Sequence, residues 1–263
     1  MKITGLLTKM ITENENPIQY YLNFNEEIII INQLLNKNIK IRFNHYQCLG
    51  CGKDKEIFAM GYCRECYFSS PYVGEWVIRP ELSTAHLGKK DRDLEVETQI
   101  QLQPHVVYLA NSGGLKVGVT RKSQIPTRWI DQGAEYAVKL AETQNRYDAG
   151  VIEVALKKHI ADKTNYRKML SENVPFVDLP EKKMELLDFI PEELQHFIVE
   201  DNQVTQLHYP IYAYPLAIKS VSLKKNPEFE GNLTGIKGQY LLFDNNLVFN
   251  IRSHEGFVVD LEF

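Results

Sequence analysis

The chain has 263 residues, of which 44% are hydrophobic and 24% charged, and its formal net charge is −4. This composition is that of an ordinary globular protein and excludes a disordered or fibrous chain. The length predicts one large domain or two to three small ones.

The N-terminal stretch MKITGLLTKMITENEN contains too short an apolar run for a signal peptide. The longest apolar candidate, EIIIINQLL, is interrupted by Asn32 and Gln33 and falls short of the roughly 18 apolar residues that span a bilayer. We therefore expect a cytoplasmic protein with no membrane partner, in a compartment that keeps thiols reduced.

Residues 1–46 form the first predicted region. Short apolar runs (IQYYLNF, EIIIIN and IKIRF) alternate there with Asn-rich turns. This pattern is typical of strands in a small antiparallel sheet.

The segment 47–70 contains all the cysteines of the chain, Cys48, Cys51, Cys63 and Cys66. Each Cys-x-x-Cys pair can chelate one ion from a tight turn, and Gly52 frees the backbone for the first of these turns. Two such pairs complete the tetrahedral four-sulfur set that zinc prefers in closed structural sites. Redox pairs or disulfides are the alternatives, but two pairs, no spare cysteine and a reducing compartment favour structural zinc.

Residues 71–104 are a loop-rich connector with prolines and a run of charges. Between 105 and 170 the pattern is strand, strand, helix, strand, helix. A tight hairpin (VVYLA, NSGG, LKVGVT) precedes a helix that starts near Pro126, a strand YAVKLAE and a helix RYDAGVIEVALKKHIADK. The last helix has the apolar period of an amphipathic helix.

Residues 171–263 combine a short helical stretch, EKKMELLDFIPEELQHFI, with β-rich sequence in which IYAYPLAIKSVSL comes first and DNN marks a later hairpin turn. The whole pattern predicts an α+β fold. Its core at 105–170 is a three-stranded antiparallel sheet with flanking helices, next to small antiparallel β regions and the four-cysteine segment.

Positive charge is concentrated in the segment 105–170. It holds eleven Lys or Arg against six Asp or Glu, a net +5 that leaves −9 for the rest of the chain. The overall charge argues against a nucleic-acid binder, but attraction to phosphate depends on the local field. Binding of nucleic acid and a merely solvated face are the two interpretations.

Four residues of this segment carry a resemblance to known proteins. Tyr108 in VVY, Gly118 in KVG, Arg128 on the next helix and Glu153 on the last helix resemble the GIY-YIG nuclease superfamily in order and spacing. The longer runs YLANSGGLKVGVTRKSQIPTRWIDQGA and AGVIEVALKKHIADKTNYRKML look closer still to an uncharacterised bacterial family. That family joins a zinc-binding segment to a GIY-YIG-like core over most of the chain and implies no established activity.

The superfamily resemblance implies a catalytic set for phosphodiester hydrolysis. Tyr108 would lie beside the attacked phosphate, and its phenol, with a reference pKa near 10, would serve as a base only if a metal or an arginine lowered that value. Arg128 would bind the scissile phosphate through its planar guanidinium. Glu153 would hold one Mg²⁺ or Mn²⁺ ion. The implied substrate contacts are Lys116, Gly118, Arg121 and Lys122.

Each catalytic position also has a structural interpretation. Tyr108 fits as an aromatic residue at the edge of the core, and Arg128 and Glu153 fit as an ion pair between helices. Glu153 nevertheless interrupts the apolar run GVI-E-VAL, where a carboxylate needs a partner or a metal.

The chain also departs from the superfamily motifs. Val106 and Val107 stand where the first motif has Gly and Ile, and Lys116 replaces the tyrosine of the second motif. Lys116 has two interpretations: it contacts phosphate as a point charge, or it is a solvated strand residue. Gly118 either admits a phosphate or is a packing glycine.

Three functions follow from these observations. The first is a metal-dependent endonuclease acting on DNA or RNA. The second is a nucleic-acid-binding module whose nuclease core is degenerate, and the third is a protein-interaction scaffold with acidic flanks. We favour the first, because packing alone does not explain Tyr, Arg and Glu in this order.

Overall fold

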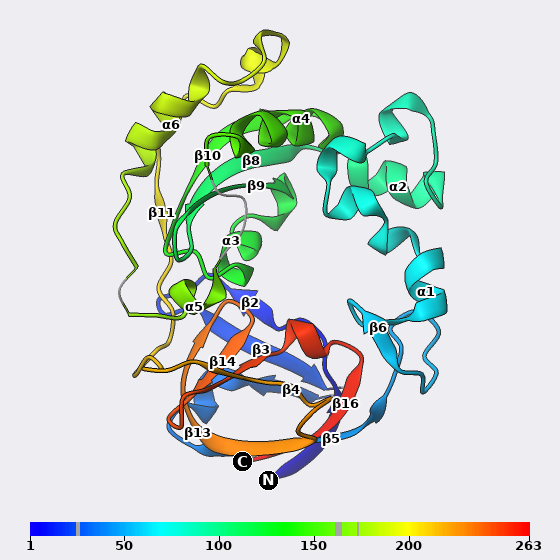
Figure 1. The fold of residues 1–263 in the computed structure, drawn as a ribbon, viewed down its shortest axis with the longest axis vertical. Helices are drawn as coiled ribbons and strands as arrows, with labels where there is room; N and C mark the ends of the chain where they lie inside the picture. The colour runs from blue at the N-terminus through cyan, green and yellow to red at the C-terminus, as the bar shows by residue number, and fades with distance from the viewer. Residues whose placement is uncertain (25–26, 161–164, 173) are drawn as a thin grey trace. The chain divides into compact units, whose positions relative to one another are not determined.

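The computed structural model describes residues 1–24, 27–160, 165–172 and 174–263 (Figure 1). Its contacts divide the chain into two compact units. The first, here called the β unit, comprises Met1–Ser69, Leu170–Glu172 and Leu207–Phe263; the second, the hairpin unit, comprises Ser70–Met169 and Asn173–Gln206. Helices together with several sheets confirm the predicted α+β class.

Strands from both ends of the sequence share one sheet in the β unit. This seven-stranded sheet has the order β1-β16-β5-β13-β14-β15-β12. Its pairs are antiparallel except for β12 and β15, which are parallel. The strands are β1 (Lys2–Leu6), β5 (Asn38–Tyr46), β12 (Lys219–Val221), β13 (Glu228–Lys237), β14 (Tyr240–Phe243), β15 (Leu247–Asn250) and β16 (Phe257–Glu262).

Two smaller sheets complete the β unit. One contains β2 (Ile11–Glu13), β3 (Gln19–Phe24) and β4 (Glu27–Ile30), and the other is the hairpin of β6 (Ile57–Ala59) and β7 (Tyr62–Cys63), followed by α1 (Arg64–Ser69). The apolar runs near the N-terminus therefore form strands as predicted. The DNN turn also joins β14 to β15 as predicted, with Asn246 at a left-handed φ of 63°.

The predicted β stretch IYAYPLAIKSVSL is largely irregular. Among the described residues, this stretch contributes the short strand β12, and Ile211 forms an isolated β-bridge with Gly235. Pro215 in the middle of this stretch lacks an N–H group, so it cannot donate to a strand ladder.

Asp260 is a buried acid in the β unit that pairs with partly exposed cations. Its carboxylate is 5% exposed and accepts hydrogen bonds from Thr4 Oγ1 at 2.7 Å and from Arg42 Nη2 at 2.6 Å. Lys2 Nζ lies 3.1 Å away. The Arg42 guanidinium and the Thr4 hydroxyl hold the pKa of Asp260 well below its usual range, so these contacts stabilise the sheet at neutral pH and are lost as the pH falls through that lowered pKa.

Replacing Asp260 by Asn should destabilise the β unit by about 1–3 kcal/mol, because its three donors would lose a charged acceptor that is itself buried. Urea unfolding followed by far-UV circular dichroism at pH 7 measures this change. Glu262→Gln is the matched control, since Glu262 belongs to the same strand but is 41% exposed; it should change stability by less than about 0.5 kcal/mol. Equal effects of the two substitutions would contradict the prediction.

The hairpin unit has the predicted order of strand, strand, helix, strand, helix. The elements are β8 (His105–Asn111), β9 (Leu115–Arg121), α3 (Thr127–Asp131), β10 (Tyr136–Thr143) and α4 (Arg146–Lys157). One difference is a fourth strand, β11 (Thr205–Gln206), which pairs with β10 and gives the sheet order β11-β10-β8-β9. A two-residue strand contributed from far along the chain leaves no periodic signal in the sequence.

The remaining helices of the hairpin unit are α2 (Leu94–Gln101), α5 (Tyr166–Met169) and α6 (Leu179–Leu187). Helix α4 ends at Lys157, earlier than predicted, and residues 161–164 of the predicted helix lie outside the described residues. Helix α6 ends four residues before Pro191. None of the described helices is long and apolar enough to cross a membrane.

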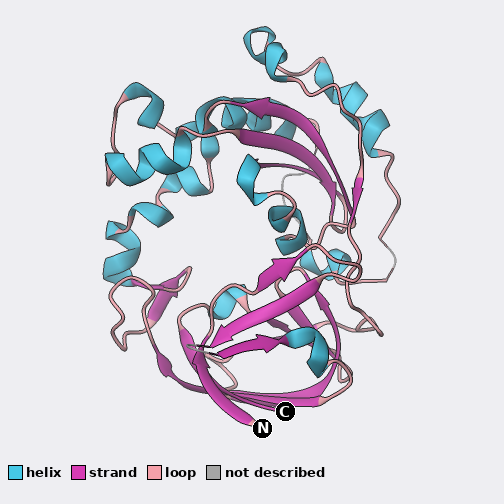
Figure 2. Ribbon diagram, turned by 180° about the vertical axis from the view of Figure 1, so that it is seen from behind, coloured by secondary structure: helices cyan, strands magenta, loops and turns pink. Residues whose placement is uncertain are grey.

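The two faces of the four-stranded sheet pack against different helices (Figure 2). Alternate strand residues such as Val107 and Leu109 form a core with Ile152 of α4 and Leu186 of α6. Tyr108 points to the other face, where its ring makes an edge contact with Trp129 of α3 at a centroid distance of 6.0 Å. The period of two along a strand thus separates the apolar core from the face that carries the predicted tyrosine.

Candidate functional site

The four cysteines of the β unit lie together. Their Sγ atoms are all within 4.8 Å of one another, which suits four thiolates around one tetrahedral ion. Gly52, directly after Cys51, adopts a left-handed φ of 68°, and its N–H donates to the carbonyl of Cys48. Cys63 ends β7 and Cys66 lies in the first turn of α1. The predicted four-cysteine cluster is confirmed.

Backbone hydrogen bonds prepare Cys48 to bind a metal. The N–H groups of Cys63 and Gly50 donate to Cys48 Sγ at 3.2 and 3.4 Å. Burial opposes ionisation of this thiol, but the backbone donors outweigh it and lower the pKa of Cys48 to about 6. The thiolate is the form that ligates a metal. Four thiolates leave no open coordination position, so such a metal would be structural.

We expect the purified protein to contain one zinc ion per chain, measured by elemental analysis or by a chromogenic zinc indicator after denaturation. Cys51→Ser should lower this content severalfold, because a closed four-sulfur site loses one of its ligands. Lys53→Ala, two residues along the same exposed turn, should keep the zinc. Zinc that is absent from the wild type, or retained by the Cys51→Ser variant, would contradict the assignment.

In the hairpin unit, Tyr108 is entirely buried at the centre of β8. It lies opposite Gly118 of β9, where an added methyl group would come within 2.6 Å of the phenol oxygen. Its hydroxyl donates to Gln132 Oε1 at 2.9 Å. Burial raises the pKa of Tyr108 more than the Arg128 charge lowers it, so the phenol stays protonated at neutral pH. Gly118 makes room for this ring, which gives it a packing role.

Glu153 is a buried acid next to apolar residues of α4. It is 6% exposed, while its neighbour Ile152 belongs to the core. Lys157 Nζ, one turn further along α4, lies 3.4 Å from Glu153 Oε2. Burial raises the pKa of Glu153, although the charges of Lys157 and Arg146 act in the opposite direction. The ion pair of Glu153 is therefore with its own helix, whereas the sequence suggested Arg128.

The three predicted catalytic side chains come from β8, α3 and α4 and interact electrostatically. Arg128, half-buried on α3, favours ionisation of the Tyr108 phenol through its charge and a hydrogen bond, and the Glu153 charge opposes it. The hydrogen bond puts Arg128 against the Tyr108 hydroxyl, and Glu153 is near enough for its charge to act on the phenol. Tyr108, Arg128 and Glu153 thus belong to one cluster, although two of them are buried.

The predicted substrate contacts divide into different environments. Lys116 is buried in β9 opposite Ala110. Lys122 is exposed and forms an ion pair with Glu142 at 2.6 Å. Arg121 is half-buried at the end of β9, and its charge acts on Arg146. Arg121 thus acts on Arg146, whereas Lys122 is paired with Glu142.

Arg146, the first residue of α4, is a charged member of this cluster that the sequence reasoning missed. It is 9% exposed, and its Nε and Nη2 donate to the carbonyls of Trp76 and Val77 at 3.1 and 2.7 Å. Burial lowers the pKa of Arg146 to about 10, which leaves it protonated at neutral pH. Arg146 directly follows Asn145, the N-cap of α4. Nothing in the sequence around this position predicts that the connector buries Arg146.

His105 is also part of the basic surroundings of the site. It is entirely buried at the start of β8, opposite Arg121, and its Nδ1 lies 2.7 Å from the Gln103 carbonyl. Burial lowers the pKa of His105 to about 4, despite the opposing effect of that carbonyl, and the charges of Arg146 and Arg121 lower it further.

His105 should make the stability of the hairpin unit depend on pH. Its unfolded pKa near 6.5 exceeds the folded value of about 4, so the unfolded chain binds more protons between these values and stability falls as the pH drops through this window. The loss contributed by His105 amounts to about 3 kcal/mol. Both tryptophans, Trp76 and Trp129, lie in this unit, so denaturation followed by tryptophan fluorescence reports on it alone.

A His105→Asn variant should lose correspondingly less stability than the wild type between pH 6.5 and pH 4. His208→Asn is the control, because His208 is an exposed histidine of the β unit. Parallel pH profiles for the wild type and His105→Asn would contradict the prediction.

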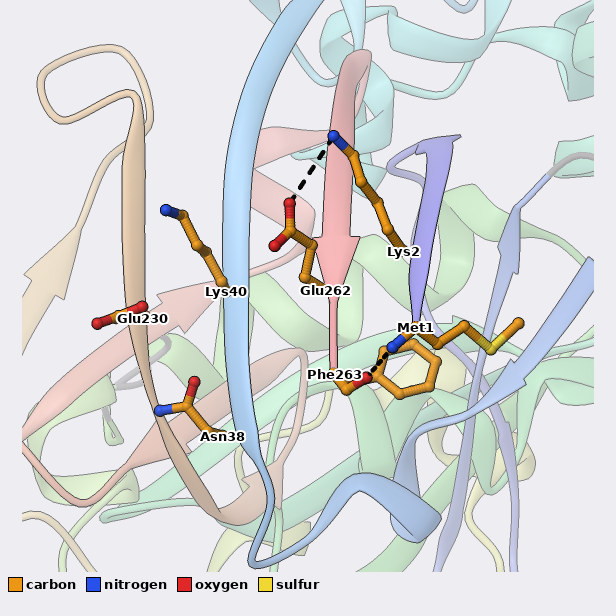
Figure 3. Close-up of a pocket in the computed structure, with 7 residues that line it drawn as sticks. All are labelled: Met1, Lys2, Asn38, Lys40, Glu230, Glu262 and Phe263. Atoms are coloured by element: carbon orange, nitrogen blue, oxygen red, sulfur yellow. Dashed lines mark hydrogen bonds and ion pairs between the residues drawn. The ribbon is translucent and has the colours of Figure 1, made fainter.

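A shallow depression on the seven-stranded sheet of the β unit has no catalytic character (Figure 3). Its charged lining residues have opposite signs, and Lys2 pairs with Glu262 at 3.7 Å. Its remaining lining residues include Met1, Asn38 and Phe263. No cysteine or histidine is among the residues that line it. The predicted site residues do not contribute to this depression.

Comparison with known proteins places the chain in a family. A family model described as a protein of unknown function (DUF2797) matches residues 36–259. Because this match spans most of the 263 residues, the chain belongs to the DUF2797 family. Searches of curated proteins and of solved structures gave no match. The family assignment is thus consistent with the predicted resemblance to an uncharacterised family, and it supplies no activity.

Proposed function

We propose that this protein is a zinc-containing, metal-dependent endonuclease that hydrolyses phosphodiester bonds in DNA or RNA through a GIY-YIG-like core. The observation that carries this proposal is the clustering of Tyr108, Arg128 and Glu153 in the hairpin unit, where the two charges act on the phenol. Packing requires neither a buried carboxylate on α4 nor an arginine directed at a buried tyrosine.

Arg128 has the chemistry of the phosphate ligand. Its guanidinium presents paired N–H donors that match two phosphate oxygens and stabilise charge that develops during hydrolysis. Arg121 and Arg146 add positive potential to the same cluster. Three arginines against the acids Glu153 and Glu81 favour binding of an anion there.

Glu153 has the chemistry of the cation ligand. Its carboxylate is desolvated, and a hard oxygen donor of this kind suits Mg²⁺ or Mn²⁺. When bound, a divalent cation supplies Lewis-acid polarisation of the phosphate. The same residue fits the resemblance that the sequence carries, in which a glutamate on the last helix of the core holds the metal.

Tyr108 acts as a neutral hydrogen-bonding group in this proposal. Because its pKa is raised by burial, the phenol is a poor base and retains its proton at neutral pH. Its single hydroxyl proton is donated to Gln132, and the phenol also shares a hydrogen bond with Arg128, so its role here is to position the arginine. The four-cysteine site would hold zinc in a closed, structural role in the β unit.

Arg128→Ala and Glu153→Gln should each lower the cleavage rate by about 100-fold or more, the cost typical of losing one group that stabilises the transition state. The measurement is cleavage of labelled single-stranded, duplex and branched DNA and RNA with Mg²⁺ or Mn²⁺. Glu185→Gln is the matched control, because Glu185 is an exposed charge outside the cluster. Activity that survives in an Arg128→Ala, Glu153→Ala double variant would refute the endonuclease proposal.

The burial of Tyr108 favours a second candidate, a nucleic-acid-binding module without catalysis. This function predicts oligonucleotide binding that weakens steeply with salt, no cleavage, and affinity that is unchanged by Glu153→Gln. Fluorescence anisotropy at several salt concentrations separates it from the first candidate. The absence of any salt-sensitive binding would instead support a protein-interaction scaffold.

A further inference from the structure

We propose that three neighbouring aromatic side chains on the four-cysteine segment, Phe58, Tyr67 and Phe68, form a stacking surface for the bases of single-stranded nucleic acid. These three residues are here called the aromatic patch. The inference deepens the proposed function and rests on it, because it names the class of substrate that the protein binds. The aromatic patch belongs to the β unit.

The local structure of the four-cysteine segment brings the three rings together. In β6, the period of two along a strand buries Ile57 and leaves Phe58 on the opposite, open side. Tyr67 and Phe68 come from α1, which contacts β6 (Figure 1). The Phe58 ring centroid lies 5.1 Å from that of Tyr67 and 5.7 Å from that of Phe68. The Tyr67 and Phe68 centroids are 5.3 Å apart.

The cysteine cluster fixes α1 against the β6–β7 hairpin. Cys63 ends β7 and Cys66 lies within α1, and their Sγ atoms belong to the cluster whose members are within 4.8 Å of one another. None of the residues of α1 is fully buried, so apolar packing holds this helix only weakly. A zinc ion on the four thiolates would hold the rings in place before a ligand binds, which lowers the ordering cost of binding.

The aromatic patch is open to solvent. Phe58 is 52% exposed and Phe68 is 59% exposed. Large apolar side chains that contact one another on a surface mark a binding site, whereas single ones do not. The rings meet at interplanar angles of 62°, 41° and 89°, so no ring of the patch is covered by parallel stacking on another. Ring surface therefore remains available to a base.

A cation lies on the same side of α1 as two of the rings. Arg64 begins α1, and Tyr67 and Phe68 follow three and four residues later, a spacing that brings side chains together on one helical face. Arg64 is exposed and forms no ion pair within the described part of the chain. Its guanidinium is thus open to a phosphate beside the rings.

The three acids of the segment 47–70 are already engaged. Glu65 Oε2 lies 2.6 Å from Lys55 Nζ, and Glu56 Oε1 lies 3.2 Å from Lys224 Nζ. Asp54 accepts a hydrogen bond from a backbone N–H. Four thiolates on one Zn²⁺ ion would carry a net charge of −2, so the segment as a whole attracts phosphate weakly. Stacking rather than charge therefore supplies most of the affinity.

The chemistry of the aromatic patch selects the ligand. An aromatic ring stacks on the flat face of any base, and a neighbouring arginine contacts the backbone that joins the bases. The bases of a duplex are stacked on one another, so their faces are open to a protein only in a single strand. Protein interfaces also use aromatic and arginine anchors. They depend on apolar area, however, whereas a base requires the flat ring, and replacement of a ring by leucine separates the two.

The first test is binding of fluorescently labelled oligo-dT to the full-length, zinc-loaded protein, measured by anisotropy without added Mg²⁺ or Mn²⁺. Phe58→Ala and Phe68→Leu should each weaken binding by about fivefold or more, the cost of losing one base–aromatic stack. Phe68→Tyr keeps a ring and should bind like the wild type. Phe176→Ala is the matched control, because Phe176 is 78% exposed but belongs to the hairpin unit; its affinity should equal that of the wild type.

The second test is the salt dependence of the same binding. Arg64→Ala should reduce the slope of log affinity against log salt concentration by about 0.7, because one phosphate contact to a single strand is lost. Arg252→Ala is the control, since Arg252 is another exposed arginine of the β unit, and it should leave the slope unchanged. Zinc content and circular dichroism verify that each variant is folded.

The outcomes separate this inference from the proposed function. Cleavage of nucleic acid together with wild-type affinity in Phe58→Ala and Phe68→Leu overturns the role of the aromatic patch and leaves the endonuclease proposal standing. Single-strand binding that depends on the rings, in a protein that cleaves no nucleic acid, supports the patch and removes the endonuclease. Tighter binding of a duplex than of a single strand, or a wild-type dimer that Phe58→Ala dissociates, overturns the inference outright.

Discussion

A buried carboxylate on helix α4 is the constraint on which the hairpin unit depends. Glu153 lies beside core residues of the helix, where an isolated charge would be strongly unfavourable. Lys157 on the same helix and Arg146 at its start both counter its burial. Arg146 in turn is held by the carbonyls of Trp76 and Val77. The acid is thus countered by cations at both ends of its own helix, one of which also binds the linking segment.

The same constraint explains why the linking segment is ordered. Residues near Pro80 and Glu81 pack on α4 at Gly150. The Arg146 guanidinium lies over the Trp76 ring, with its Cζ 5.6 Å from the ring centroid. A close approach of two backbones requires glycine at the contact. The segment is therefore a structural part of the hairpin unit, and it encloses the side of α4 that carries Glu153.

The β unit is organised by a different interaction, the pairing of strands from the two ends of the sequence. Strand β16 lies between β1 and β5, and Asp260 of β16 joins Arg42 of β5 to Thr4 of β1. The four-cysteine cluster forms around the short β6–β7 hairpin, where apolar residues alone are too few for a core. The four-cysteine cluster and long-range strand pairing together therefore define this unit.

Local sequence determined the four-cysteine cluster and the α+β class. It also determined the order of elements in residues 105–170, which is strand, strand, helix, strand, helix. These features are predictable because ligand spacing and apolar period act over a few neighbouring residues. It also singled out Glu153, since an acid within an apolar helical run is visible without coordinates. Only the tertiary structure decided that Tyr108 is buried against Gly118, that Arg146 joins the cluster and that Glu81 approaches α4. Those features depend on contacts between residues distant in the sequence. Desolvation, which shifts the pKa values of Tyr108 and Arg146, exists only after these segments pack.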